Sequence, residues 1–447
     1  MAKACAEIAP RRSRVRVRLA PLKFCGLQKR RVRRQVRFRY RGLDSELIGF
    51  DRRTIEVVTR LVGRLLLAGV AALAAVVAVH AAAAPTVGVP LLAYRSGELM
   101  ELEPLSLQPI RSAHVPVPQV TVSWSFDPTR QVVVLGGLER LALFDLDAWR
   151  TRLSVRLPGY IVATSWSRDR LVALVDEAPG FLESVTLDPR TGRVLQRHRV
   201  AREVEAAAAY RGGIVAITAP AGAIGPARVV VFAAGAAPRT VGLGGIIAGE
   251  SGNRFVVPAL SILESAGRAF VVGTNGTLAT VDLGRGTVAF RRTRQLSAAE
   301  KGIRASVRHA VWLGEGRLAV SGWTNQNRAV GLTLLNVRSG RLRVLDTSAD
   351  SMSAGDGVLV GYRFSFPPAR GLPGGGVSVY SASGRRRFHV LGNSTIAAAE
   401  VVGARIYVDP DELHVLVIDS RTGRTLATAP GELPELLTGV PSWSRVQ

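Results

Sequence analysis

One short pattern recurs along most of this chain and constrains its fold more than any other feature. An apolar strand is followed by an acidic or polar residue, a few turn residues ending in glycine, and a second strand. The clearest copy runs from Val185 to Leu195, with Asp188 before the turn and Gly192 at its end. Asp or Asn caps such a turn by accepting backbone N–H bonds, and glycine tolerates the positive φ that the turn needs. Each copy therefore predicts two antiparallel strands joined by a tight turn.

The copies return at a nearly regular spacing. The anchor residues before the turns are Glu103, Asp145, Asp188, Phe232, Asp282, Asn336, Tyr380 and Asp419, and the copies at Glu103, Asp145 and Phe232 are the weaker ones. The steps between anchors are 42, 43, 44, 50, 54, 44 and 39 residues, and a second hairpin precedes each anchor, as at 166–175 and 311–320. Four strands in a period of this length are typical of a propeller. The sequence predicts an all-β fold, a β-propeller of about eight four-stranded blades, or seven if the copy at Glu103 or Phe232 is not a blade.

The two ends of the repeat region predict how the ring closes. The first repeat begins at Leu91 with a segment that fits a second strand, so its innermost strand is missing. The tail Pro441–Arg445 repeats the Ser-Trp-Ser pattern of Val122–Ser125 and Thr164–Ser167. We expect the carboxy-terminal strand around Trp443 to complete the first blade beside Leu91 and to remove the exposed sheet edges.

The repeat resembles that of bacterial propellers of the pyrroloquinoline-quinone-like and YVTN type, which place an aspartate and a threonine-glycine turn between two strands. Asp188 with Gly192 and Asp419 with Gly423 match best, and the Ser-Trp-Ser strands resemble those of periplasmic TolB-like propellers. The resemblance covers about residues 90 to 446 and implies the fold rather than an activity. Quinoprotein dehydrogenases of this shape carry a cysteine pair and a tryptophan on many blades, whereas this region has no cysteine.

Charge and hydropathy divide the chain into three parts. Residues 1–64 hold 19 Lys plus Arg and 5 Asp plus Glu, so that 40 bases and 29 acids, net +11, remain in the rest of the chain. We predict a basic tail at 1–60, disordered or the product of a start site assigned too far upstream, a signal peptide or transmembrane helix at 61–84, and the propeller at 85–447. A cytoplasmic tail next to a membrane segment explains the arginines better than nucleic-acid binding does.

The segment 65–84 contains no charged residue and follows Arg60 and Arg64, as an export signal does. It is also long enough to span a bilayer and to hold the protein in the membrane if it is not cleaved. Either outcome predicts a membrane-anchored or secreted, extracytoplasmic protein. Cys5 and Cys25 both precede this segment, so the exported part has no cysteine for a disulfide, a zinc site or a nucleophile.

The long connections predict where a ligand binds. In an up-and-down blade, the turns between strands one and two and between strands three and four share one face of the ring. The remaining connections share the other face, and they include all four long segments, Leu243–Phe255, Arg292–Ser306, Gly322–Arg328 and Arg363–Gly376. Binding residues concentrate on such loops. The candidate ligand-binding residues are Arg254, Lys301, Trp323, Asn325, Asn327, Arg328, Arg363, Phe364 and Phe366.

No catalytic or metal-binding set stands out. The histidines of the repeat region lie far apart in the sequence, and Asp409, Asp411 and Glu412 lack the spacing and glycine of a calcium loop. We predict no catalytic residue, no metal and no cofactor. The leading hypothesis is a non-enzymatic binding or scaffold propeller that holds a protein segment or a glycan on its long-loop face. The alternative is a propeller enzyme, a hydrolase, lyase or quinone-dependent oxidoreductase, with its site in the central channel.

Overall fold

The computed structural model describes residues 91–117, 123–177, 180–252, 254–293, 305–326, 328–364 and 375–437, together with the backbone of 442–444. The predicted basic tail at 1–60 and the predicted export segment at 61–84 lie outside these residues. Within the described part of the chain, no helix is long and apolar enough to cross a membrane. The helical content of that part is a single short 3-10 helix, η1 (Glu264–Ala266), and the fold is all-β.

The strands form seven hydrogen-bonded sheets. The first contains β32 (Glu435–Leu436), β1 (Leu91–Arg95), β2 (Glu98–Leu102) and β3 (Pro109–His114). The second contains β4 (Ser123–Phe126), β5 (Val132–Gly136), β6 (Leu138–Asp145), β7 (Arg150–Ser167), β8 (Arg170–Glu177), β9 (Phe181–Leu187) and β10 (Val194–Val200). The third contains β33 (Ser442–Ser444), β11 (Glu203–Tyr210), β12 (Gly213–Ala219), β13 (Gly225–Ala233), β14 (Arg239–Ser251) and β15 (Arg254–Val256).

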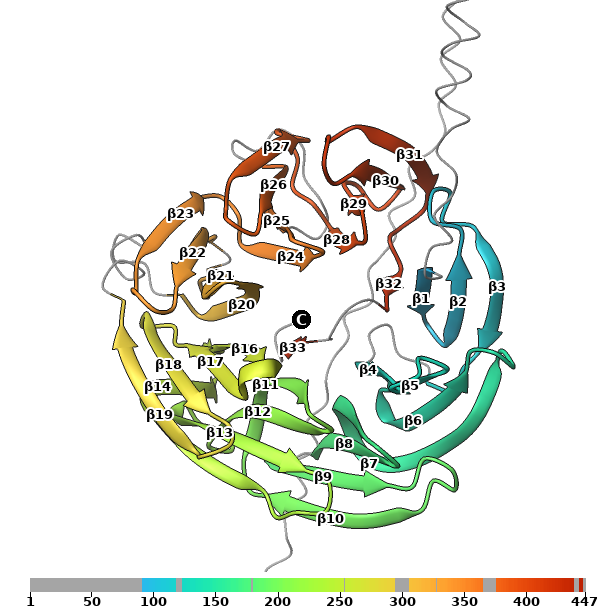
Figure 1. The fold of residues 1–447 in the computed structure, drawn as a ribbon, viewed down its shortest axis with the longest axis vertical. Helices are drawn as coiled ribbons and strands as arrows, with labels where there is room; N and C mark the ends of the chain where they lie inside the picture. The colour runs from blue at the N-terminus through green and yellow to red at the C-terminus, as the bar shows by residue number, and fades with distance from the viewer. Residues whose placement is uncertain are drawn as a thin grey trace, which may run out of the picture. The chain divides into compact units, whose positions relative to one another are not determined.

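The other four sheets are plain four-stranded meanders. They contain β16 (Ala259–Leu263), β17 (Arg268–Val272), β18 (Thr277–Asp282) and β19 (Thr287–Arg292); then β20 (Val307–Gly314), β21 (Arg317–Trp323), β22 (Leu332–Asn336) and β23 (Leu342–Asp346); then β24 (Ser351–Gly355), β25 (Val358–Tyr362), β26 (Val377–Ser381) and β27 (Arg386–Val390); and then β28 (Ala398–Val402), β29 (Arg405–Asp409), β30 (His414–Asp419) and β31 (Thr425–Pro430). Neighbouring sheets follow one another around a central space, so the described domain is a β-propeller (Figure 1).

The long strand β7 belongs to two meanders of the second sheet. Its first part pairs with β6, from Asp145 opposite Arg150 to Leu138 opposite Tyr160, and its second part pairs with β8 as far as Ser167 opposite Arg170. β7 is therefore the outermost strand of β4–β7 and the innermost strand of β7–β10. Seven sheets agree with the lower blade number, but not for the predicted reason. The copies at Glu103 and Phe232 both belong to meanders, and the number falls because two meanders share β7.

The eight anchor residues occupy equivalent positions. Each lies at or next to the turn between the third and fourth strands of a meander, as Asp282 does between β18 and β19. The Asp282 carboxylate accepts the N–H groups of Gly284 and Arg285 at 2.9 and 2.8 Å, and Asp419 accepts those of Arg421 and Thr422 at 3.2 and 2.7 Å. The Arg285 N–H holds the pKa of the Asp282 carboxyl group below its usual range, and the Thr422 hydroxyl, which donates to Asp419 at 2.6 Å, does so for Asp419 together with the backbone N–H groups. The turn chemistry predicted from the repeat is thus confirmed.

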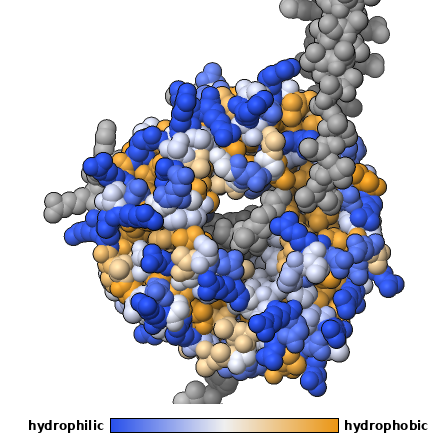
Figure 2. Space-filling view, in the orientation of Figure 1, coloured by the Kyte–Doolittle hydropathy of each residue, from blue (hydrophilic) through white to orange (hydrophobic). Residues whose placement is uncertain are grey.

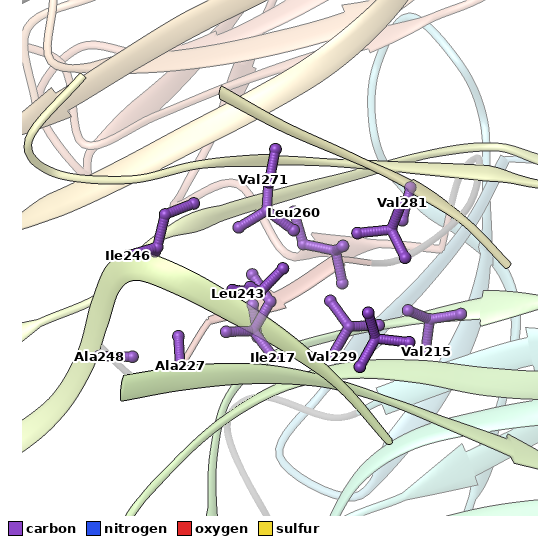
Figure 3. Packing of buried hydrophobic residues seen from close by; sticks show 14 of the residues in the cluster. Val215, Ile217, Ala227, Val229, Leu243, Ile246, Ala248, Leu260, Val271 and Val281 are labelled. Carbon is purple, nitrogen blue, oxygen red and sulfur yellow. The ribbon is translucent and has the colours of Figure 1, made fainter. Parts of the chain in front are cut away.

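The core consists of apolar side chains packed between neighbouring meanders. In Figure 3, Val215, Ile217 and Val229 of the β11–β14 meander face Leu260, Val271 and Val281 of the next one. The second strands are buried most completely, since every residue of β5 and of β12 is buried. Burial of each such side chain contributes about 1.5–3 kcal/mol, so the blades are joined mainly by these interfaces.

Arginines of the outermost strands connect neighbouring blades at their edges. Arg239 of β14 donates to the Gly284 carbonyl oxygen at 2.5 Å, and Arg343 of β23 donates to that of Ser383 at 3.0 Å. Arg387 of β27 likewise donates to the Ser420 carbonyl oxygen at 3.1 Å. In each case the acceptor lies in the third-to-fourth-strand turn of the following blade. The turn glycine leaves room for the arginine, because a Cβ at Gly384 would meet Arg343 Nη2 at 2.1 Å and Leu334 Cδ2 at 2.8 Å.

Ring closure differs from the prediction in the segment that performs it. Glu435 and Leu436 pair with Tyr94 and Ala93 of β1, so β32 is the innermost strand of the first blade. The strand around Trp443 pairs instead with β11 in another sheet. The prediction that Trp443 closes the ring is wrong because sequence similarity identified an inner-strand pattern, whereas pairing depends on which edge the chain reaches first. The closing strand comes from the carboxy-terminal end of the chain, as expected.

One predicted loop is also a strand. Residues 243–251 belong to β14, which pairs with β13 again at Ile247 and Ala248 after an irregularity in register, and Ser251 then lies opposite Arg254 of β15. Burial of Leu243, Ile246 and Ala248 keeps this glycine-rich segment in the sheet.

Candidate functional site

The connections divide into two classes, as the sequence predicts. We call the face with the first-to-second and third-to-fourth turns the short-turn face, and the opposite face the long-loop face. The connection β21–β22 spans residues 324–331, and β25–β26 spans residues 363–376; both join second and third strands, so both belong to the long-loop face. The inner strands β11, β16, β20 and β24 lie around the central space (Figure 1).

Trp323 packs on a buried cationic segment at the start of β20. Its ring lies 4.9 Å from the ring of His309, with 37° between the planes. Burial lowers the pKa of His309 to about 4, so the imidazole is neutral at physiological pH. The neighbouring Arg308 is 2% exposed, and burial lowers its pKa to about 10, which leaves the guanidinium charged. The rings of Trp323 and His309 are therefore in contact, and the buried cation Arg308 is the neighbouring residue of β20.

The loop above this segment is a compact turn with an exposed polar surface. Thr324 Oγ1 accepts the N–H groups of Gln326 at 3.1 Å and Arg328 at 3.3 Å, and the Thr324 N–H donates to the Arg328 carbonyl oxygen at 3.0 Å. The side chains of Asn325 and Arg328 are exposed. The backbone is thus held by its own threonine, while the amide and the guanidinium remain free to meet solvent or a ligand.

In the next blade, Asp350 fixes the start of the β25–β26 connection. The Asp350 carboxylate accepts the Phe364 N–H at 2.8 Å and the Ser351 hydroxyl at 3.0 Å, and the Ile396 N–H donates to the Arg363 carbonyl oxygen at 2.9 Å. Asp350 is 6% exposed, and this burial raises its pKa to about 6 in spite of the hydrogen bonds and the nearby Arg363. Phe364 itself is 47% exposed.

A second carboxyl group lies on the inner strand of the following blade. Glu400 of β28 accepts the Ser353 hydroxyl of β24 at 2.9 Å, and burial raises the pKa of Glu400. Burial, reinforced by the charges of Glu400 and Asp350, also raises the pKa of Tyr362. These groups form a polar junction between the last two meanders, close to the central space.

A small pocket of about 80 Å³ lies among the inner strands of four blades. Its lining residues are Ala206 and Ala207 of β11, Pro258, Ala259 and Leu260 at β16, Arg308, His309, Ala310 and Val311 of β20, and Met352 of β24. The side of the ring that Figure 2 shows is hollowed at its centre. The pocket offers a cation and a neutral imidazole in otherwise apolar walls, which suits a small polar or anionic group of a larger ligand.

The predicted site residues fall into three groups. Trp323 ends β21, Asn325 and Arg328 lie on the β21–β22 connection that follows it, and Arg363 with Phe364 begins the connection of the adjacent blade. Arg254 is exposed on the hairpin β14–β15 of another blade. Lys301, Asn327 and Phe366 lie outside the described residues.

Sequence reasoning missed the buried ionisable groups of this region. Arg308, His309, Asp350 and Glu400 are not among the candidates. The residues next to them in the sequence give no signal that separates a buried charge from an exposed one. Burial of these charges arises from packing between blades that are distant in the sequence.

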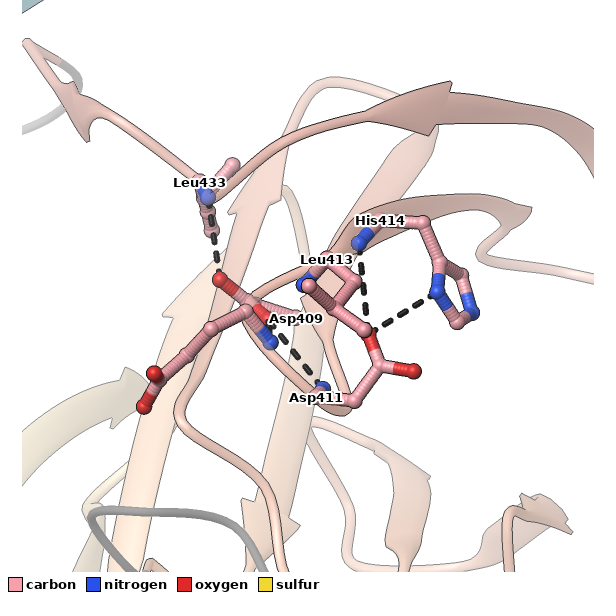
Figure 4. Close-up of polar contacts among 6 residues, drawn as sticks. Asp409, Asp411, Leu413, His414 and Leu433 are labelled. Atoms are coloured by element: carbon pink, nitrogen blue, oxygen red, sulfur yellow. Dashed lines mark hydrogen bonds and ion pairs between the residues drawn. The ribbon is translucent and has the colours of Figure 1, made fainter. Parts of the chain in front are cut away.

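The acidic segment near residue 409 has a structural role. Asp409 accepts the N–H groups of Glu412 at 2.7 Å and Leu433 at 3.0 Å, and Asp411 accepts that of Leu413 at 3.1 Å (Figure 4). Asp411 also pairs with His414 at 2.8 Å. The carboxylates cap a turn and hold the segment that leads to β32. No group of three or more His, Cys, Asp or Glu side chains in the described ranges is arranged to hold a metal ion.

No protein-family model and no curated protein matches the chain. Among solved structures, the chain is similar to the dihydro-heme d1 dehydrogenase NirN in complex with DHE, with a TM-score of 0.56 and 12% identity over 79% of this chain and 74% of that one. BamB from Moraxella catarrhalis gives a TM-score of 0.38 with 12% identity, over 77% of this chain and 90% of that chain. Sqt1 from Saccharomyces cerevisiae gives 0.48 with 13% identity, over 71% and 86%. These neighbours are β-propeller proteins. The similarity to NirN, at 12% identity, supports the β-propeller fold of this chain and nothing beyond the fold.

Proposed function

We propose that this chain is a non-enzymatic, extracytoplasmic binding propeller whose long-loop face holds a protein segment or a glycan. The observation that carries the proposal is the contrast within one blade between an ordered backbone and exposed recognition groups. Thr324 fixes the turn that presents Asn325 and Arg328, and Trp323 is seated on His309 below it. Such a preorganised loop loses little conformational entropy when a ligand binds.

The residues exposed on this face suit a ligand that has both polar groups and a flat ring or side chain. Asn325 offers an amide that can donate and accept, and Arg328 offers a guanidinium fork. Phe364, on the adjacent blade, is an exposed aromatic platform of the kind on which a sugar ring or a peptide side chain can stack. Arg308, which is buried and charged, lines the small pocket among the inner strands.

The extracytoplasmic location rests on the sequence. The uncharged segment 65–84 behind Arg60 and Arg64 fits an export signal or a membrane anchor, and the absence of cysteine after it is compatible with either redox environment. Mass spectrometry of the native amino terminus tests this part: a start between residues 81 and 85, or recovery of the intact chain from membranes, is expected. A full-length chain in the soluble cytoplasmic fraction would contradict it.

We also infer that the ring has eight blades, because β7 serves two of them. The strand has 18 residues, more than twice the length of most others, and each half pairs as one strand of a four-stranded meander. Counted in this way, each of the eight anchors marks one blade. A break in the hydrogen bonds of β7 near Pro158 and Gly159, seen as rapid amide exchange there, is the expected sign of the boundary.

The binding function is tested by screening the purified chain against glycan and peptide arrays. The double variant Trp323→Ala with Arg328→Ala is expected to weaken binding of the ligands so identified by at least tenfold, since a buried aromatic contact and a charged hydrogen bond each contribute about 1–3 kcal/mol. Arg338→Ala, on a short turn of the same blade, is the matched control. Equal binding by the double variant and the parent chain would contradict the proposal.

An enzyme with its site in the central channel is the second candidate. It is favoured by Asp350, whose pKa of about 6 is that of a carboxyl group able to act as a general acid near neutral pH. Asp350 is already bonded to Phe364 and Ser351, however, which fits a structural carboxyl group equally well. If the chain turns over a ligand from the array, and Asp350→Asn abolishes that turnover, the chain is an enzyme rather than a binding protein.

A further inference from the structure

The excess positive charge of the propeller is concentrated on its outer edge. We call the outermost strands of the meanders, β3, β10, β14, β19, β23, β27 and β31 with residues 150–159 of β7, the outer rim. The rim holds 12 arginines and 2 acids, Glu250 and Asp346, a net charge of 12 − 2 = +10. The sequence after residue 64 has a net charge of 40 − 29 = +11. Almost the whole excess therefore belongs to one narrow band of the molecule.

All 12 of these arginines are exposed, and most lack a carboxylate partner among the described residues. Four are paired: Arg111 with Glu101, Arg156 with Glu139, Arg197 with Glu183 and Arg199 with Glu177, at 2.6–2.8 Å. Arg239, Arg343 and Arg387 bond to the neutral carbonyl groups described above, so their charge is not compensated. The field around the rim is positive in spite of its structural bonds.

Exposed apolar side chains lie on the same rim, four of them on strands that carry arginines and one, Leu426, on β31, which carries none. Ile110 is 61% exposed, and Leu195, Phe290, Val344 and Leu426 are 41–48% exposed. Phe290 directly precedes Arg291 and Arg292 on β19, and Val344 follows Arg343 on β23. The rim therefore combines guanidinium groups with small apolar platforms.

Protection of the sheet edges explains only part of this composition. An outermost strand needs a charge, most often lysine, or a proline to prevent edge-to-edge pairing, and glutamate can also serve that purpose. The rim has six times as many arginines as acids, and the arginines occur on seven of its eight strands. An excess of positive over negative charge that is repeated from blade to blade indicates an anionic partner.

We propose that the outer rim binds a linear acidic polysaccharide that follows the circumference of the ring. The arginines occur on successive blades, and a flexible polyanion can follow such a curved band, whereas a flat bilayer can meet the edge of a ring only over a small arc. Guanidinium groups bind carboxylates and sulfates through paired hydrogen bonds, and the exposed apolar groups beside them suit the faces of sugar rings. The site is separate from the long-loop face and does not depend on the function proposed for it.

The first test is arginine footprinting on the purified full-length chain. Heparin and polygalacturonate are the probes, and modification by phenylglyoxal is read by mass spectrometry residue by residue. We expect modification of Arg150, Arg152, Arg292 and Arg386 to slow at least threefold when either probe is present. The matched set on the short-turn face, Arg190, Arg285, Arg338 and Arg421, is expected to react as before. Because the readout is local, binding of a probe to the basic residues before position 64 does not affect it.

The second test replaces four rim arginines, Arg150→Gln, Arg152→Gln, Arg292→Gln and Arg386→Gln, whose side chains form no hydrogen bond or ion pair with the described residues. The affinity for heparin at 0.15 M salt is expected to fall about tenfold, and the slope of log affinity against log salt to decrease by about 3, as for four ionic contacts to a linear polyanion. The four Arg→Gln changes of the short-turn set remove the same charge and are expected to change the affinity less than twofold.

Three outcomes would overturn the proposal. Equal loss of affinity in the two variant sets would mean that net charge alone attracts the probes. Protection of the rim by vesicles of phosphatidylglycerol and phosphatidylcholine, without protection by either polysaccharide, would assign the rim to a membrane. Protection by duplex DNA alone would assign it to nucleic acid.

Discussion

The two faces of the ring are built by different means. On the short-turn face, Asp188, Asp282, Asn336 and Asp419 repeat one solution, in which a side-chain oxygen accepts the backbone N–H groups of a turn that ends in glycine. On the long-loop face each connection differs, and buried ionisable groups such as Asp350 support it from within. The comparison teaches that the first face is specified locally and maintains the ring, whereas the second depends on tertiary packing and can vary without loss of the fold.

Glycine substitution on the short-turn face should give the largest effect. Gly384→Ala is expected to lower the free energy of unfolding by about 2–3 kcal/mol, because its φ of +78° disfavours a side chain and the new Cβ would displace Arg343 and Leu334. Gly357→Ala, with a φ of +73° and no atom within 4 Å of the new Cβ, is the matched control and should cost about 1 kcal/mol. Chemical denaturation measures both. Equal losses would show that the arginine contact between blades contributes nothing.

Neutralising the buried carboxyl group of the long-loop face should change the pH dependence of stability. The pKa of Asp350 is raised to about 6, so the folded protein binds a proton that the unfolded chain releases near pH 4, and the free energy of unfolding falls as pH rises between these values. Asp350→Asn removes this decrease in the free energy of unfolding. The stability of the variant relative to the parent is expected to grow by about 1–3 kcal/mol from pH 4 to pH 7.

Thermal or chemical denaturation at several pH values measures this difference, and comparison with the parent chain removes the opposite contribution of His309, which is protonated only below about pH 4 in the folded state. A constant difference between the two chains across this range would show that Asp350 is ionised at low pH as an exposed aspartate is.

Removing one turn cap should give a smaller effect. Asp419→Ala is expected to destabilise the protein by about 1 kcal/mol, because the N–H groups of Arg421 and Thr422 lose their acceptor. Asp419→Asn retains an acceptor oxygen and should recover most of the loss in a denaturant titration. A variant with asparagine as unstable as the one with alanine would mean that charge, rather than hydrogen bonding, holds the turn.

The smallest effect is expected at an exposed residue of the long-loop face. Asn325→Ala should change the free energy of unfolding by less than about 0.5 kcal/mol, since the turn is held by Thr324 and the Asn325 side chain is exposed. Denaturation of this variant alongside Asp419→Ala compares the two faces directly. A loss as large as that of Asp419→Ala would remove the distinction between a structural face and a variable one.

The sequence predicts the repeating part of the fold well because the information is local. Asp, three turn residues and glycine specify a hairpin wherever they occur, so the anchors, the strand class and the number of strands per blade follow from short segments. The closing strand is not predictable in this way, since Glu435 and Leu436 show no Ser-Trp-Ser pattern and are identified only by their pairing with β1. The glycine-rich segment 243–255 is misread for the opposite reason, because burial of Leu243 and Ile246 outweighs a local preference for a loop.

The candidate site is predictable only in its exposed half. Trp323, Arg328 and Phe364 were identified because they lie on long connections, where side chains reach solvent. Arg308, Asp350 and Glu400 depend on contacts between blades, and nothing in their neighbouring residues distinguishes a buried charge from a surface one. The same limit applies to the outer rim, which becomes visible only when strands far apart in the sequence are known to share one edge of the ring.

The most direct test of the contrast between the faces is hydrogen exchange with a ligand bound. The purified chain is measured by mass spectrometry with and without the tightest ligand from the array screen. The account predicts slower exchange in peptides covering 323–331 and 362–364, and unchanged exchange in the turns that follow Asp188, Asp282, Asn336 and Asp419. Slower exchange in those turns, with no change at 323–331, would contradict it.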